Sequence, residues 1–135
     1  MGLDCSHDAF SGGYARFNHM RYKILSAAVG RTIIPFEPKS DKFLAGLFGE
    51  CNVTYENLGG EWKTVPEEPL MILIAHADNE GFITPEHCIL LHNRILELMP
   101  EIEKIVDDSY QLGLIQAFAA GCLLAHSEGE RLEFR

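Results

Sequence analysis

The sequence predicts an α+β fold in which a helix-rich single domain carries a small antiparallel sheet. Apolar residues recur at helical spacing over three long stretches, and short stretches at both ends of the chain have the character of strands. At 135 residues and 47% hydrophobic, the chain is long enough to bury one core. No internal repeat or linker-like run divides it, so residues 1–135 are expected to form one globular domain.

The N-terminal part is expected to form a strand followed by a long helix. Residues 1–8 end before a glycine pair and are typical of a short strand. Apolar side chains follow helical spacing over residues 11–29, and Gly30 is a stop signal for that helix. A further helical turn or two is expected at residues 42–48, after two prolines.

The central part contains a predicted hairpin and a short apolar element. Residues 53–55 and 62–65 flank a glycine-containing turn at 57–60, which favours two antiparallel strands. Residues 70–75 are all apolar, and six residues are too few for periodicity to separate a buried strand from a short buried helix. Two β-branched residues within the run and prolines on its N-terminal side favour the strand.

A long helix is predicted after this element. Thr84 is a good N-cap, and Pro85 suits the first helical position. Helical spacing continues to about residue 99, and Pro100 is expected to end the helix before a separate short helical piece at residues 101–106.

The C-terminal part is expected to form a central helix and a last strand. Ser109 can cap a helix over residues 110–126, and Gly129 lies where a C-cap glycine is expected. That helix is apolar almost all round, so we expect neighbours to pack closely against it. Residues 131–135 alternate and predict a strand that pairs with the N-terminal one.

The net charge of -9 is unevenly distributed along the chain. Residues 1–50 contain six Lys or Arg against five Asp or Glu, whereas residues 51–135 contain five against fifteen. Such a surface repels phosphate backbones, which argues against nucleic-acid binding. The basic residues gathered within 16–31 are interpreted as a solvated helix face.

The cysteines and the apolar runs indicate a cytoplasmic protein. The chain has neither a C-x-x-C pair nor a leading signal peptide, so no disulfide framework is expected among its widely spaced cysteines, which are Cys5, Cys51, Cys88 and Cys122. The longest apolar stretch, residues 112–125, is interrupted by Gln116 and is shorter than the ~20 residues that a bilayer crossing needs. We therefore expect no membrane span.

The segment that begins at His76 partly follows the calcium-binding EF-hand pattern. With Gly81 at the sixth loop position, Asp78 and Glu80 occupy the third and fifth ligand positions. The first and twelfth positions are His76 and His87, and these replace oxygen ligands that calcium requires. The pattern therefore argues against calcium.

Imidazole, thiol and carboxylate together suit zinc better than calcium. If the N-terminal strand lies beside the central loop, then Cys5, His7, His76 and Asp78 form a four-ligand set, and Glu80 is a candidate general base. The alternative is a buried Cys5, hydrogen-bonded histidines near a strand end, and an Asp78 that caps a turn.

Thr84 is a candidate ligand-binding residue for a different reason. The free backbone amides at the start of the helix that it caps attract an anion or a carboxylate. No nucleotide-binding or hydrolase motif of the common kinds is present elsewhere in the sequence.

Three stretches, Met1 to His7, Tyr14 to Asn18 and His76 to Cys88, resemble a group of small uncharacterised proteins from bacteria and their phages. Those proteins share a GLD-x-SH opening and an H-S-D-x-D-G loop followed by a Pro-x-x-Cys helix. In this chain Ala77 replaces the serine of the loop, and Glu80 replaces its second aspartate. The resemblance implies a bacterial or phage origin and a shared loop, and it implies no particular activity.

These observations lead to two functional hypotheses. The first is a non-enzymatic cytosolic domain that binds a protein or a small molecule near residues 76–84. The second is a zinc-dependent hydrolase that uses the Cys, His and Asp set. The apolar last helix can bury against a second copy as well as inside the monomer, so a homo-oligomer is also compatible with the sequence.

Overall fold

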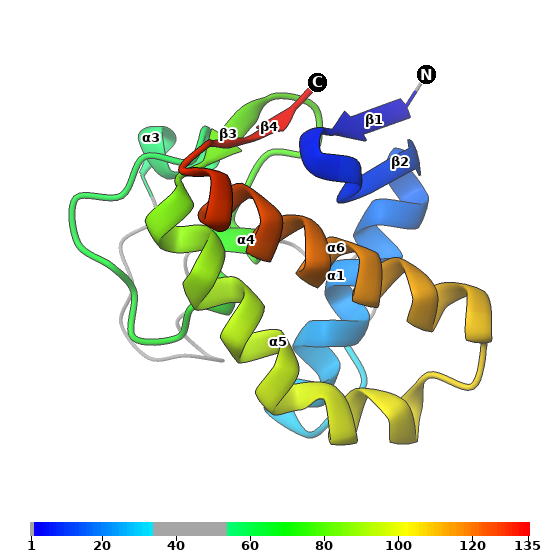
Figure 1. Ribbon diagram of the computed structural model, residues 1–135. Helices are drawn as coiled ribbons and strands as arrows, with labels where there is room; N and C mark the ends of the chain where they lie inside the picture. The colour runs from blue at the N-terminus through cyan, green and yellow to red at the C-terminus, as the bar shows by residue number, and fades with distance from the viewer. Residues whose placement is uncertain (1, 34–53) are drawn as a thin grey trace.

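A computed structural model describes residues 2–33 and 54–135 and confirms a helix-rich α+β fold. Three long helices, α1 (Tyr14–Val29), α5 (Pro85–Ile105) and α6 (Ser109–Glu128), pack together on one side of a small sheet, as Figure 1 shows. Helices α5 and α6 form an antiparallel pair joined by a short connection (Figure 1). None of the described helices combines the length and the apolarity needed to cross a bilayer.

The sheet joins the two ends of the chain. Its four antiparallel strands lie in the order β2-β1-β4-β3, formed by Phe10–Gly13, Gly2–Cys5, Leu132–Phe134 and Gly81–Ile83. Cys5 pairs with Phe134, which confirms the predicted pairing of the first and last strands. The N-terminal strand is shorter than expected, because the 3-10 turn η1 (Ser6–Asp8) follows it with His7 at φ 60° and Asp8 at φ 55°.

The predicted central hairpin is wrong in the part that the structure describes. Residues 54–65 contain no strand, and Tyr55–Leu58 form the short helix α3 instead. The Asn57 side chain explains this, since its Oδ1 accepts from the Thr54 backbone N–H (2.8 Å) and its Nδ2 donates to the Glu61 carbonyl (2.6 Å). An asparagine side chain that hydrogen-bonds the backbone on both sides closes a compact turn, so those backbone groups are not free to pair two strands. The fourth strand is β3.

At residues 70–75 the slight preference for a strand is wrong, and the alternative that the sequence left open, a short buried helix, is what forms. Leu70–Ile74 make up the fully buried helix α4. Backbone groups at both ends of α4 bond side chains outside the helix, one from the adjacent segment and one from α1. Glu68 accepts from the Leu70 backbone N–H (3.1 Å), and Arg21 of α1 donates to the Leu73 carbonyl (3.0 Å). A single helical turn is marginal alone, so these tertiary partners and complete burial determine its conformation.

Helix α5 continues through Pro100, where the sequence predicts a break. Proline inside a helix costs roughly 3 kcal/mol. Leu98 and Ile102 lie on either side of it on one buried face, so continuing the helix keeps both in the core. The Thr84 cap is confirmed, because the Thr84 hydroxyl accepts from the His87 backbone N–H (3.3 Å).

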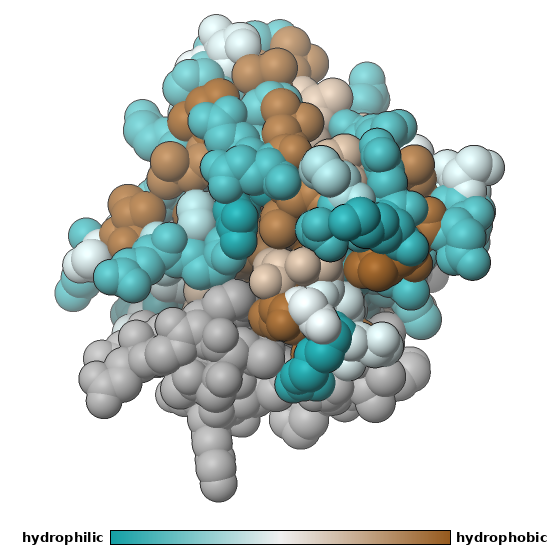
Figure 2. Space-filling view, turned by 90° about the horizontal axis from the view of Figure 1, so that it is seen from below, coloured by the Kyte–Doolittle hydropathy of each residue, from teal (hydrophilic) through white to brown (hydrophobic). Residues whose placement is uncertain are grey.

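Helix α6 is less central than predicted. Its N-cap is Asp108, not Ser109, since Asp108 Oδ1 accepts from the Tyr110 backbone N–H (2.9 Å). One face is buried, but Leu123 and Leu124 on the other are 40% and 44% exposed. The face opposite the sheet mixes apolar and hydrophilic residues where they are described (Figure 2).

The helical turn expected at 42–48 lies outside the described residues.

Candidate functional site

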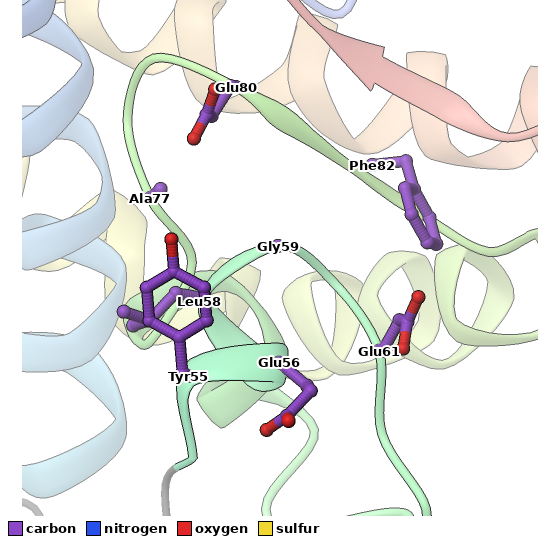
Figure 3. Close-up of a pocket in the computed structure, with 8 residues that line it drawn as sticks. All are labelled: Tyr55, Glu56, Leu58, Gly59, Glu61, Ala77, Glu80 and Phe82. Atoms are coloured by element: carbon purple, nitrogen blue, oxygen red, sulfur yellow. The ribbon is translucent and has the colours of Figure 1, made fainter.

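The central loop that attracted attention in the sequence lines one side of a surface pocket of about 340 Å³. Helix α3 and the turn after it form the other side, and Figure 3 shows the two sides facing one another. We refer to this cavity as the α3 pocket, and its lining consists of Tyr55, Glu56, Leu58, Gly59, Glu61, Ala77, Glu80 and Phe82. Of the predicted site residues, Glu80 is the one that borders it.

Glycines allow the two sides of the α3 pocket to approach closely. Backbone hydrogen bonds join them, from the Ala77 N–H to the Leu58 carbonyl (2.8 Å) and from the Phe82 N–H to the Gly59 carbonyl (3.1 Å). Gly60 has φ +101°, and a Cβ at this position would overlap the Phe82 carbonyl oxygen. Only glycine therefore permits this contact, and the pocket depends on it.

His76 lies buried directly behind the loop. Its ring stacks on Phe134 with centroids 4.1 Å apart, while Nδ1 faces the Ala77 carbonyl (2.7 Å) and Nε2 faces the Phe82 carbonyl (2.9 Å). Burial lowers the pKa of His76, and the two carbonyls oppose part of that shift because they accept protons from the ring. With both nitrogens against backbone oxygens, His76 fixes the loop and has no free nitrogen for a metal ion.

A buried cation anchors the same loop from the other side. Arg21 of α1 is 1% exposed and donates to the Leu73 and His76 carbonyls and to Asn18 Oδ1. Asn18 Nδ2 in turn donates to Asp78 Oδ2 (3.2 Å), so the Asp78 carboxylate is linked to the guanidinium through an amide. Burial lowers the pKa of Arg21 to about 10, and Asp78 opposes that shift.

The side chains of the α3 pocket combine exposed apolar surface with negative charge. Tyr55 is 84% exposed and Leu58 is 38% exposed, which is unusual for apolar side chains of this size on one helical turn. Hydrogen bonds from its own backbone N–H and from Thr54 lower the pKa of Glu56. None of the lining residues is basic, and three of them are glutamates.

The structure does not bring the four predicted zinc ligands together. Cys5 is 3% exposed in the core, and burial raises the pKa of its thiol to about 12, with a smaller contribution from Asp4. His76 and Asp78 are engaged as described above. A buried neutral thiol and a doubly bonded imidazole are poor metal ligands, so the assumed adjacency of strand and loop does not produce a site.

His7 has different neighbours from those predicted. Its Nε2 lies 3.0 Å from Glu130 Oε1 and 3.4 Å from Glu128 Oε2, both at the end of α6. The Glu130 carboxylate raises the pKa of Glu128, while Glu128 and His7 lower the pKa of Glu130. The sequence offered one signal for this cluster, since Gly129 was identified as the turn after the helix and the two glutamates flank it.

The Thr84 side chain caps helix α5 and does not line the α3 pocket. Its hydroxyl accepts from the His87 backbone N–H, so the capping function that was predicted uses the side chain that was considered for ligand binding. Comparisons with known proteins found no matching family model, no matching curated protein and no matching solved structure.

Proposed function

We propose that this protein binds an organic cation, an amine or a guanidinium group, in the α3 pocket. The observation that carries this proposal is the lining itself, in which an exposed tyrosine and leucine lie among Glu56, Glu61 and Glu80. No basic residue belongs to the lining, although Lys63 acts on Glu56 and Arg131 stacks on Phe82 from outside it. This is a binding function, in line with the first hypothesis from the sequence.

Charge and shape favour a cation over other ligands. Three glutamates around a hollow create a negative potential that concentrates positive ligands, although each exposed carboxylate alone contributes little. Aromatic faces attract cations, and the exposed Tyr55 ring lies beside Leu58 on the α3 side of the pocket (Figure 3). Phe82 already holds one guanidinium, that of Arg131, 4.0 Å from its ring centroid.

The size of the pocket also fits. A volume of about 340 Å³ is near the lower end of the range for small-molecule sites, roughly 300–1,000 Å³, and matches a single side chain or a small amine. A free amine and a Lys or Arg side chain of a partner protein share this chemistry. The zinc hydrolase hypothesis lacks its ligand set, so Glu80 is assigned here to ligand contact.

The experiment is an NMR titration of the uniformly ¹⁵N-labelled 135-residue chain with n-butylguanidinium, and in parallel with the neutral isostere N-butylurea. We expect amide shifts at residues 55–61 and 77–82 with the cation and not with the urea, with a Kd in the millimolar range, as for other very small ligands. Equal shifts with both probes, or none with either, would contradict the proposal.

Two variants test the role of the carboxylates. Glu80→Gln should weaken the response to n-butylguanidinium, because it removes one charge and keeps the shape of the side chain. Glu103→Gln on α5 removes an exposed charge outside the pocket and should leave the response unchanged. An arginine-containing peptide in place of the small probe distinguishes a protein ligand from a free amine.

A further inference from the structure

We propose that His7, Glu128 and Glu130 form a binding site for a divalent transition-metal ion of the zinc class. The site is separate from the α3 pocket and does not depend on its function. It keeps one of the ligands predicted from the sequence and replaces the other three with carboxylates from the end of α6.

The spacing of the ligand atoms matches a metal coordination shell. His7 Nε2 lies 3.0 Å and 3.4 Å from the two carboxylate oxygens, and all three atoms lie within 4.8 Å of one another. Ligands about 2.0–2.2 Å from zinc are separated by roughly 3.3–3.6 Å in a tetrahedron and by about 2.8–3.1 Å in an octahedron. The glutamate side chains are about half exposed and can adjust to close around an ion.

The imidazole is oriented from behind, as in many metal sites. Its Nδ1 lies 2.8 Å from Ser6 Oγ, and that oxygen also accepts from the Glu133 backbone N–H (2.8 Å) on β4. Without an ion, Nε2 lies within hydrogen-bond distance of Glu130 Oε1 (3.0 Å). With an ion bound, Nδ1–H would donate to the serine and the lone pair of Nε2 would bind the ion. The His7 side chain is only 10% exposed, so its orientation is held by the surrounding protein.

The local electrostatics favour a cation. Glu128 and Glu130 lie at the carbonyl end of α6, where the helix dipole disfavours negative charge. Their carboxylates also lie close to one another, and their ion pairs with described residues all involve His7. A divalent ion would compensate both carboxylates.

Arg131 and Arg135 bring positive charge close to the site, because they line an adjoining cavity of about 330 Å³ together with His7 and Glu130. They oppose metal binding to some extent. The Arg131 guanidinium, however, is stacked over the Phe82 ring. The adjoining cavity leaves room for water to complete the coordination of an ion held by three protein ligands.

Two tight turns bring these residues together. A Cβ on Gly121 of α6 would lie 2.5 Å from the Ala9 Cβ, so this glycine allows the turn that contains His7 to rest directly on the helix. Gly129 has φ +66°, and the Glu130 N–H bonds the Ala125 carbonyl (2.9 Å) in a Schellman turn that folds Glu130 back toward Glu128.

The test is titration of the 135-residue chain, without a polyhistidine tag, with Co²⁺ monitored by visible absorption and with Zn²⁺ monitored by calorimetry. We expect one equivalent of either ion to bind. Glu130→Gln should weaken binding by at least about tenfold, the lower end of the loss seen for changes in outer-shell partners of metal ligands. His7→Asn should do the same, and asparagine tolerates the left-handed backbone at this position.

Glu133→Gln is the matched control, because its side chain lines the same cavity without belonging to the ligand cluster. Its affinity for Zn²⁺ should equal that of the unchanged protein. Circular dichroism establishes that each variant is folded, and the exposed Glu130 position keeps the test valid if His7→Asn does not fold. Absence of binding, unchanged binding in Glu130→Gln, or equal losses in Glu130→Gln and Glu133→Gln would overturn the proposal.

Discussion

Replacing Arg21 with methionine should lower the free energy of unfolding by about 2–3 kcal/mol, the upper part of the range for a buried acceptor that loses its donor. Methionine retains much of the aliphatic length of arginine and therefore its packing in the core. What is lost is the guanidinium, which donates to the carbonyls of Leu73 (3.0 Å) and His76 and to Asn18 Oδ1.

The magnitude follows from the acceptors that remain. The His76 carbonyl loses a charged donor in the core, whereas the Leu73 carbonyl keeps the His76 backbone N–H (3.3 Å) and Asn18 is only part-buried. An unsatisfied buried group costs roughly 1–3 kcal/mol. The opposing term is the desolvation of the guanidinium, several kcal/mol in the folded protein, which the variant no longer incurs. The unsatisfied acceptor prevails because the His76 carbonyl ends α4 in the core and has little access to water.

The assay is urea unfolding followed by circular dichroism at pH 7, with the midpoint and the slope fitted separately. Arg21→Lys keeps the charge but not the forked geometry, so we expect a smaller loss of about 1–2 kcal/mol. Arg16→Met is the matched control, since it makes the same chemical change on an exposed turn of α1, and it should stay within about 0.5 kcal/mol of the unchanged protein.

A loss below about 0.5 kcal/mol in Arg21→Met would refute this reasoning, because exposed substitutions produce effects of that size. It would mean that relief of desolvation cancels the cost of the unsatisfied His76 carbonyl. NMR shifts at residues 76–80 give a second readout, since the same variant removes the link to Asp78 and should alter the conformation of the loop.

Three further predictions concern glycines and histidines. Gly60→Ala should destabilise the protein by more than about 2 kcal/mol and abolish the response to n-butylguanidinium, whereas Gly59→Ala, at φ -90°, should have a small effect in both assays. Burial lowers the pKa values of His76 and His87, so as the pH falls these histidines take up protons in the unfolded chain before they do so in the folded protein. The free energy of unfolding should therefore fall as the pH drops below about 6.5. Urea unfolding at pH 7.5 and 5 should show a smaller difference in that free energy for His87→Leu than for the unchanged protein. Gly121→Ala should weaken Zn²⁺ binding by displacing the turn that contains His7, and unchanged affinity in calorimetry would contradict that packing argument.

The elements that the sequence predicts correctly are those with local signals. Thr84 and Pro85 begin α5 as expected, Gly30 and Gly129 end their helices in the left-handed conformation, and the residues at 131–135 form a strand. In each case the determining interaction lies within a few residues, so chain order and local propensity are sufficient.

The elements that the sequence predicts wrongly are those whose backbone groups are satisfied from a distance or by a side chain within the segment. Residues 70–74 are helical because Arg21, from another helix, bonds the end of the turn. The expected hairpin is replaced by α3 because the Asn57 side chain binds the backbone on both sides. Apolar character alone does not distinguish these outcomes.

The candidate site shows the same division. Residue chemistry identified the loop that contains Glu80 and identified His7 as a ligand type, and both lie at locations where we now propose binding. Their partners could not be identified from the sequence, because Tyr55 belongs to a segment interpreted as a strand and Glu128 lies more than a hundred residues from His7. The sequence by itself determined the helix-rich class, the helix ends marked by Thr84, Gly30 and Gly129, and the acidic character of this protein, since these depend on composition and on neighbouring residues. Only the tertiary structure determined which side chains meet, because folding brings distant segments together through glycine contacts and buried hydrogen bonds that no local pattern records.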